Sequence, residues 1–173
     1  TPRPEGGAER SVRGRARGGG FQDGHIAELD KGVKVVVQSC YITALPMRIV
    51  SRMFTEPDGD PEQDLFGMIS NGVDHAGLLV LMYPRPVVVA AAALDFFPIE
   101  RTHRTFREVR RFYERFHHRY RLDLVESYTP HQFSLEHPAA AFEFLYHFHG
   151  IGVPQRLPAV HTLRAKSSLS PCA

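Results

Sequence analysis

Lysine is scarce in this sequence, and the scarcity shifts nearly all of its positive charge onto arginine. Of the 21 basic residues among 173, only Lys31, Lys34 and Lys166 are lysines, while the formal net charge is +2. Because the guanidinium group offers a rigid donor fork that matches phosphates and carboxylates, this bias favours contact with nucleic acid or an acidic partner. A GC-rich genome would produce the same bias, so composition leaves both explanations open.

Cysteine is also scarce, which excludes two kinds of stabilised domain. The two cysteines, Cys40 and Cys172, lie far apart in the sequence and form no Cys-x-x-Cys pair, so a disulfide framework or a paired-cysteine zinc site is not expected. No secretory signal pattern is recognisable, and the arginine-rich beginning suits an organellar targeting segment. We therefore expect an intracellular location, with the mitochondrion or another organelle as candidate compartments.

No apolar stretch is long enough and uninterrupted enough to cross a membrane. Residues 78–97 have the length, but they contain Pro84, Arg85, Pro86 and Asp95, and a charge near the bilayer centre costs on the order of 3 kcal/mol. With 43% hydrophobic residues, the chain has the composition of a globular domain.

The composition divides the chain into three parts. Residues 1–24 are rich in glycine and arginine and offer little that can be buried, which predicts a flexible basic arm. Residues 25–165 are expected to form a single domain, and residues 166–173 a polar C-terminal tail.

Within the domain, β-branched and apolar runs predict strands, and amphipathic periodicity predicts helices. Apolar side chains recur at steps of three and four over 102–120, and a proline start with a glycine end marks 138–149. The expected strands are residues 33–43, 47–54, 78–83, 87–97, 122–128 and 160–163. The predicted fold class is α+β: a mixed or antiparallel sheet of about five to six strands with two main helices packed on it, plus the basic arm.

The arginines are the candidate binding residues. Eight of them, in the arm and on the predicted helix, are candidates for contact with a polyanion or a protein partner: Arg10, Arg13, Arg15, Arg17, Arg104, Arg107, Arg111 and Arg115. Phosphate contacts need only charge and reach. An ordinary solvated helix face explains the same pattern and stays open.

No pattern in the sequence commits to a chemistry. A Gly-x-Ser-x-Gly elbow and a P-loop are both missing, and His147 and His149 point apart on a helix, so they cannot share a metal. His75 beside Asp74, or His131 after Pro130, could act as bases in three dimensions. We expect no catalytic residue, metal, cofactor or small-molecule ligand, and we lean towards a protein that is not an enzyme.

The second half of the chain resembles the GNAT acyltransferases. The order of strand 87–97, helix 102–120, strand 122–128 and helix 138–149 is similar to the end of that fold. The resemblance implies binding of acyl-coenzyme A, with backbone amides around its pyrophosphate. The connector at residues 98–105 has no glycine, so Arg101 and Arg104 would have to substitute as donors.

Two hypotheses follow. The first is a non-catalytic structural subunit of a larger assembly, a ribonucleoprotein or an organellar complex, that contacts other protein subunits, with RNA as a further partner. The alternative is a GNAT-like, acyl-coenzyme-A-dependent N-acyltransferase with an atypical phosphate loop. Neither predicts a membrane span.

Overall fold

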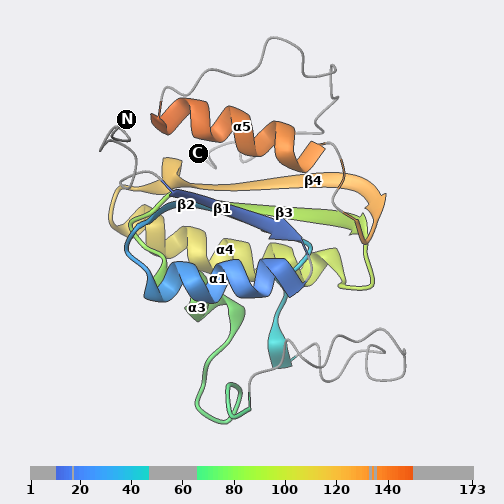
Figure 1. Ribbon diagram of the computed structural model, residues 1–173. Helices are drawn as coiled ribbons and strands as arrows, with labels where there is room; N and C mark the ends of the chain where they lie inside the picture. Colours follow the sequence, from blue (N-terminus) through green and yellow to red (C-terminus); the bar gives the residue numbers. More distant parts are fainter. Residues whose placement is uncertain (1–10, 17, 47–65, 133, 135, 150–173) are drawn as a thin grey trace, which may run out of the picture.

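Four parallel strands form one sheet in the computed structural model, which describes residues 11–16, 18–46, 66–132, 134 and 136–149. The strands are β1 (Ser11–Ala16), β2 (Val33–Ser39), β3 (Val87–Leu94) and β4 (Leu122–Pro130). They lie side by side in the order β1-β2-β3-β4, and every neighbouring pair is parallel. Their carboxyl ends therefore gather along one edge of the sheet (Figure 1).

Helices cover both faces of the sheet. They are α1 (Gly18–Leu29), α3 (His75–Leu81), α4 (Ile99–Arg115) and α5 (Glu136–His149). Figure 1 shows α5 alone on one face, with α1, α3 and α4 on the other. A short 3-10 turn, η3 (Arg119–Arg121), leads from α4 into β4. Helical crossovers are the connections that parallel strands require.

The two faces of the sheet build two apolar clusters of different size. Side chains that alternate along β2 and β3 point to opposite faces. Val36 and Val87 pack with Leu79 of α3 and with Val109 and Tyr113 of α4. On the other face, Val37 and Val88 pack against Ala141 of α5. Strands β2 and β3 are thus buried on both sides.

The prediction of a mixed or antiparallel α+β sheet of five to six strands with two main helices is wrong. The described residues form four parallel strands with four α-helices. The physical reason lies in the runs Val33–Ser39 and Val87–Leu94, whose residues are almost all buried. Parallel strands covered on both faces have near-continuous apolar runs, and such a run carries no information about the direction of its neighbour.

The segment 78–83 is helical, not a strand as predicted. Asp74 caps α3: its side chain accepts hydrogen bonds from the backbone N–H groups of His75 and Leu45, each at 2.7 Å. His75, Ala76, Leu78 and Leu79 are buried. A short helix that is buried in this way has the same unbroken apolar run as a buried strand, so periodicity alone cannot separate them. The predicted helices at 102–120 and 138–149 are confirmed as α4 and α5, with shifted ends.

The prediction of a flexible arm over residues 1–24 is wrong for its second half. Strand β1 pairs with β2 along its length, and helix α1 begins at Gly18. Composition missed this because the backbone pairing of a strand with its neighbour does not depend on an apolar composition. The amide of Gln38, buried in β2, donates to the carbonyl of Gly20 at 2.8 Å and accepts from the N–H of Gly24 at 3.1 Å. A Cβ on Gly24 would lie 2.9 Å from that amide, so glycine lets the helix approach the sheet.

Three other predicted segments lie outside the described residues: the strands at 47–54 and 160–163, and the tail at 166–173. Among the residues that the structure does describe, no helix has the length and apolar character needed to span a membrane.

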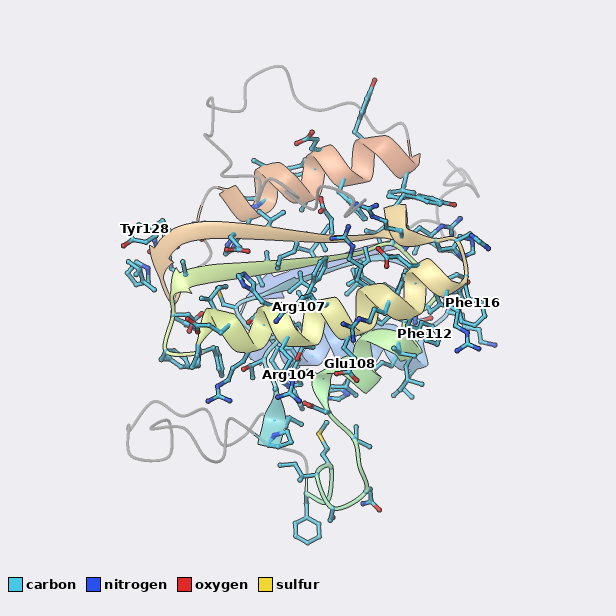
Figure 2. The ribbon with its side chains drawn as sticks, turned by 180° about the vertical axis from the view of Figure 1, so that it is seen from behind. Arg104, Arg107, Glu108, Phe112, Phe116 and Tyr128 are labelled. Atoms are coloured by element: carbon cyan, nitrogen blue, oxygen red, sulfur yellow. The ribbon has the colours of Figure 1, made fainter. Side chains whose placement is uncertain are left out.

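We predict that Asp74→Ala lowers the free energy of unfolding by about 1–2 kcal/mol, because it removes the cap of α3 and the acceptor for Leu45. Urea denaturation measures the change. Glu108→Ala is the control: this residue is exposed on α4 (Figure 2), so its substitution should stay within about 0.5 kcal/mol. Equal effects of the two substitutions would contradict the capping role.

Candidate active site

The residue that follows each of three neighbouring strands carries a chemically active side chain. Cys40 follows β2, Asp95 follows β3 and His131 follows β4. One ligand-type atom from each of the three lies within 4.8 Å of the other two. In open sheets of parallel strands, binding and catalytic groups characteristically lie at the carboxyl ends of the strands. The cluster of Cys40, Asp95 and His131, called the edge cluster below, occupies that position.

Asp95 and His131 form a close, buried pair. The Nδ1 atom of His131 lies 2.8 Å from both carboxylate oxygens of Asp95. Only 6% of the His131 side chain and 3% of the Asp95 side chain are exposed. Because an ionised carboxylate can only accept hydrogen bonds, Nδ1 is the protonated ring nitrogen, and Nε2 becomes the basic one. This is the arrangement that prepares a histidine to take up a proton.

The surroundings hold both members of this pair in position. The backbone N–H of Phe97 donates to Oδ1 of Asp95 at 3.0 Å. The ring of Phe96 lies 4.2 Å from that of His131, between centroids, at an interplanar angle of 32°. Phe97 contacts the same ring at 5.8 Å. The imidazole is therefore fixed by the carboxylate on one atom and by aromatic packing on its face.

Cys40 has an unusual backbone at the end of β2. Its φ angle is +49°, a left-handed conformation that costs a non-glycine residue energy and is frequent at functional sites. Its N–H donates to the carbonyl of Ala90 at 2.9 Å, and its Sγ lies 3.4 Å from the carbonyl oxygen of Gln132. The loop after β4 thus reaches back across β3 to the end of β2.

The thiol of Cys40 is protonated at neutral pH. Burial, followed by the negative charge of Asp95, raises the pKa of Cys40 to about 11. A cysteine acts as a nucleophile only as the thiolate. In this environment Cys40 is therefore a neutral group beside the carboxylate rather than an activated nucleophile.

The sequence at the end of β1 has glycines at the spacing of a nucleophile elbow but no nucleophile. The sequence Gly14-Arg15-Ala16-Arg17-Gly18 spans the end of β1 and the start of α1. It shares only the glycine spacing of the pattern Gly-x-Ser-x-Gly, which places a serine on a strand-to-helix turn; Ala16 stands at the serine position. Ala16 pairs with Ser39, the residue before Cys40, so this turn adjoins the edge cluster.

A second buried histidine attaches α5 to the sheet close to this site. His137 is fully buried, and its two ring nitrogens each lie 2.9 Å from a serine hydroxyl, Nδ1 from Ser39 of β2 and Nε2 from Ser127 of β4. These bonds fix the start of α5 against strands on either side of β3. They also fix the far end of the loop that carries His131.

The arginines predicted to bind a polyanion do not converge on the edge cluster. Arg104, Arg107, Arg111 and Arg115 are exposed along α4; Figure 2 shows the first two on that helix. Arg13 and Arg15 belong to β1, whereas Arg10 and Arg17 lie outside the described residues. Their role as a binding surface stays a prediction.

Of His75 and His131, the two histidines considered as bases, only His131 lies in the edge cluster. His75 is fully buried, and its Nδ1 accepts from the N–H of Thr43 at 2.8 Å, so it joins α3 to the segment after β2. His131 meets Asp95. Sequence reasoning did not connect His131 with Asp95 or Cys40: the predicted strands 33–43 and 87–97 contained Cys40 and Asp95, and the predicted strand 122–128 ended three residues before His131. Knowing that the strands are parallel would have brought all three together.

A parallel sheet with helices on both faces, with an aspartate and then a histidine after its last two strands, is an arrangement found in the α/β-hydrolase fold. Comparison with solved structures supports this fold. A methylesterase aligns with a TM-score of 0.60 and 18% identity over 76% of this chain and 28% of its own. An esterase from Pyrococcus furiosus aligns with a TM-score of 0.53 and 14% identity, over 80% and 54% respectively.

An acylaminoacyl peptidase from Pyrococcus horikoshii aligns with a TM-score of 0.57 and 12% identity, over 84% of this chain and 25% of its own. The chain thus spans about a quarter to about half of the length of these structures. No family model matches the sequence, and no curated protein matches it. At these identities the likeness establishes the fold.

These findings overturn both functional hypotheses drawn from the sequence. The structural neighbours are esterases and peptidases, so the hypothesis of a non-catalytic structural or ribonucleoprotein subunit that binds RNA is wrong. The GNAT resemblance is wrong as well: the order of elements from β3 to α5 was read correctly, but it belongs to a different parallel sheet. The subunit hypothesis was inferred from the arginine content, but the charge of a protein surface does not determine the fold.

The raised pKa of Cys40 predicts slow alkylation. In the Cys172→Ser variant Cys40 is the remaining cysteine, and with a pKa of about 11 its thiolate fraction at pH 8 is roughly 10⁻³. The rate of reaction with iodoacetamide should rise about tenfold per pH unit between pH 7 and 9. Mass spectrometry follows the reaction, with the urea-unfolded variant as control. A rate that levels off near pH 8.5 in the folded protein would contradict the assignment.

Proposed function

We propose that this chain hydrolyses a carboxylic ester, with Asp95 and His131 as the acid–base pair. The observation that carries the proposal is the buried contact of His131 Nδ1 with both oxygens of Asp95 at the carboxyl edge of the sheet. Two of the three structural neighbours described above are named as esterases, which supports ester rather than another bond as the substrate class.

The nucleophile in this proposal is water. Ala16 stands at the serine position of the elbow, and the protonated thiol of Cys40 is not nucleophilic, as argued above. Nε2 of His131 removes a proton from a water molecule, whose oxygen attacks the carbonyl carbon of the ester. When the tetrahedral intermediate collapses, the imidazolium returns that proton to the departing alkoxide. The products are a carboxylic acid and an alcohol, and Asp95 stabilises the charged imidazolium meanwhile.

An ester fits this mechanism better than an amide. An alkoxide or phenoxide leaves without a covalent acyl-enzyme step, whereas an amine is a far poorer leaving group and requires protonation first. General acid–base catalysis by a positioned histidine contributes about 10²–10⁴-fold. A rate of that size is detectable with an activated ester, and the protein should be slow in comparison with hydrolases that have a serine nucleophile.

We predict that His131→Gln and Asp95→Asn each lower the hydrolysis of p-nitrophenyl acetate by about 10²-fold or more, because each removes one half of the acid–base pair. The release of p-nitrophenol measures the rate, in buffer that contains a chelator. His117→Asn is the control: His117 is exposed and has a φ of +61°, a conformation that asparagine tolerates. If the His131 and His117 variants were equally active, the proposal would be refuted.

We also predict that Ala16→Ser raises the rate by about tenfold or more and introduces a burst of product, since a hydroxyl on the elbow can form an acyl-enzyme. Stopped-flow absorbance records the burst. The double variant Ala16→Ser, His131→Gln should show neither effect, because the serine needs the histidine as its base. A gain that survives in the double variant would place the new activity outside this site.

A further inference from the structure

The edge cluster combines three types of metal ligand in a buried place: a thiol, a carboxylate and an imidazole. We propose that Cys40, Asp95 and His131 form a binding site for a divalent transition-metal ion such as Zn²⁺. The mutual distances within 4.8 Å carry the proposal, and it does not depend on the hydrolytic activity proposed above.

The distances suit a tetrahedral ion. Ligands at ~2.0–2.3 Å from zinc lie roughly 3.5 Å from one another. Atoms within 4.8 Å of one another would therefore approach by at most about 1.3 Å, and the 2.8 Å contact between His131 and Asp95 would lengthen if Nδ1 were the ligand atom. Three protein ligands with water as the fourth is the usual composition of an open zinc site. A thiolate with an imidazole favours zinc and its neighbours in the series over Mg²⁺ or Ca²⁺, which prefer oxygen ligands.

The charge and the surroundings also suit a cation. Asp95 is a buried carboxylate with 3% of its side chain exposed, and Cys40, 4% exposed, would add a second negative charge after losing its proton to the solvent on binding. A dication balances both. The hydroxyl of Ser39 lies 3.8 Å from Sγ of Cys40 and is oriented as a donor to it, which is a typical second layer around a metal-bound thiolate.

Cys40, Asp95 and His131 are positioned by three different strands. Each directly follows a different strand, and the left-handed φ of +49° at Cys40 turns the chain where β2 ends, beside Asp95. His131 arrives on the loop after β4, which crosses β3 to contact Cys40 through Gln132. A rigid parallel sheet fixes these three strand ends relative to one another, so the ligand set is largely preformed.

Metal binding and the proposed hydrolysis exclude one another. Asp95 and His131 would both be ligands, so neither could serve in proton transfer while the ion is bound. Zn²⁺ should therefore inhibit any hydrolysis that depends on His131, and a chelator should restore it. The site would act as a metal-sensitive block on the edge cluster.

Cobalt titration tests the site without reference to activity. Co²⁺ bound to a thiolate gives a charge-transfer absorption band, and we expect it to appear with one equivalent per chain in the unaltered protein. The band should vanish in Cys40→Ser and weaken at least tenfold in apparent affinity in His131→Gln and Asp95→Asn. Zn²⁺ should displace the cobalt and remove the band. Circular dichroism confirms that each variant is folded.

Two matched controls separate this site from adventitious binding. Cys172→Ser removes the other cysteine of the sequence, and His117→Asn removes an exposed histidine; both should keep the band unchanged. A band that survives in Cys40→Ser, one that is lost in Cys172→Ser, or no band at all in the unaltered protein would overturn the proposal. A band in a protein without esterase activity would refute the proposed function alone, and activity without a band would refute the metal site alone.

Discussion

Parallel pairing of the four strands is the constraint on which the rest of the structure depends. Because β1 to β4 all run in one direction, each connection must cross a face of the sheet. Helices α3 and α4 lie in such connections and bury Val36 on one face, whereas α5, which follows β4, buries Val37 on the other. The same direction brings every carboxyl end to one edge. Residues separated by more than ninety positions, such as Cys40 and Gln132, meet there for that reason alone.

The closeness of Asp95 and His131 follows from this geometry and from a few local contacts. Strands β3 and β4 are neighbours, so the residues that follow them start close together, and Phe96 with Phe97 fixes the imidazole over the carboxylate. His137 holds the start of α5 between Ser39 and Ser127, which sets the span of the loop that carries His131. Removing solvent from the pair strengthens the interaction of a carboxylate with an imidazolium, the charge that proton uptake creates.

Some of the helices and strands could be predicted from the sequence, whereas the edge cluster could not. Helix α4 was found from its amphipathic period and α5 from its proline and glycine ends, because those signals are local. The helical α3 was missed, since a short helix with most of its apolar residues buried resembles a buried strand, and β1 was missed, since backbone pairing leaves no trace in composition. His131 was noted as a conceivable base, but its partner Asp95 was visible only after the direction of the strands was known. Arginine is the most conspicuous feature of the sequence, but Arg104, Arg107, Arg111 and Arg115 lie exposed along α4 and take no part in the edge cluster.

The proposed ester hydrolysis and the proposed metal site both take account of Ala16 at the serine position of the elbow pattern. In a hydrolase with a serine at that position, the basic nitrogen of the histidine is committed to the hydroxyl group. Here Ala16 stands at that position, so both proposals assign the histidine a role that does not involve a serine hydroxyl: proton transfer with water, or metal binding together with the thiol of Cys40. Both uses draw on the same fact: a buried carboxylate, an imidazole and a thiol lie within 4.8 Å of one another, and the sheet that assembles them is independent of the residue on the turn. The edge cluster is therefore assembled without a serine on the turn, and each proposal requires only a base or a set of ligands.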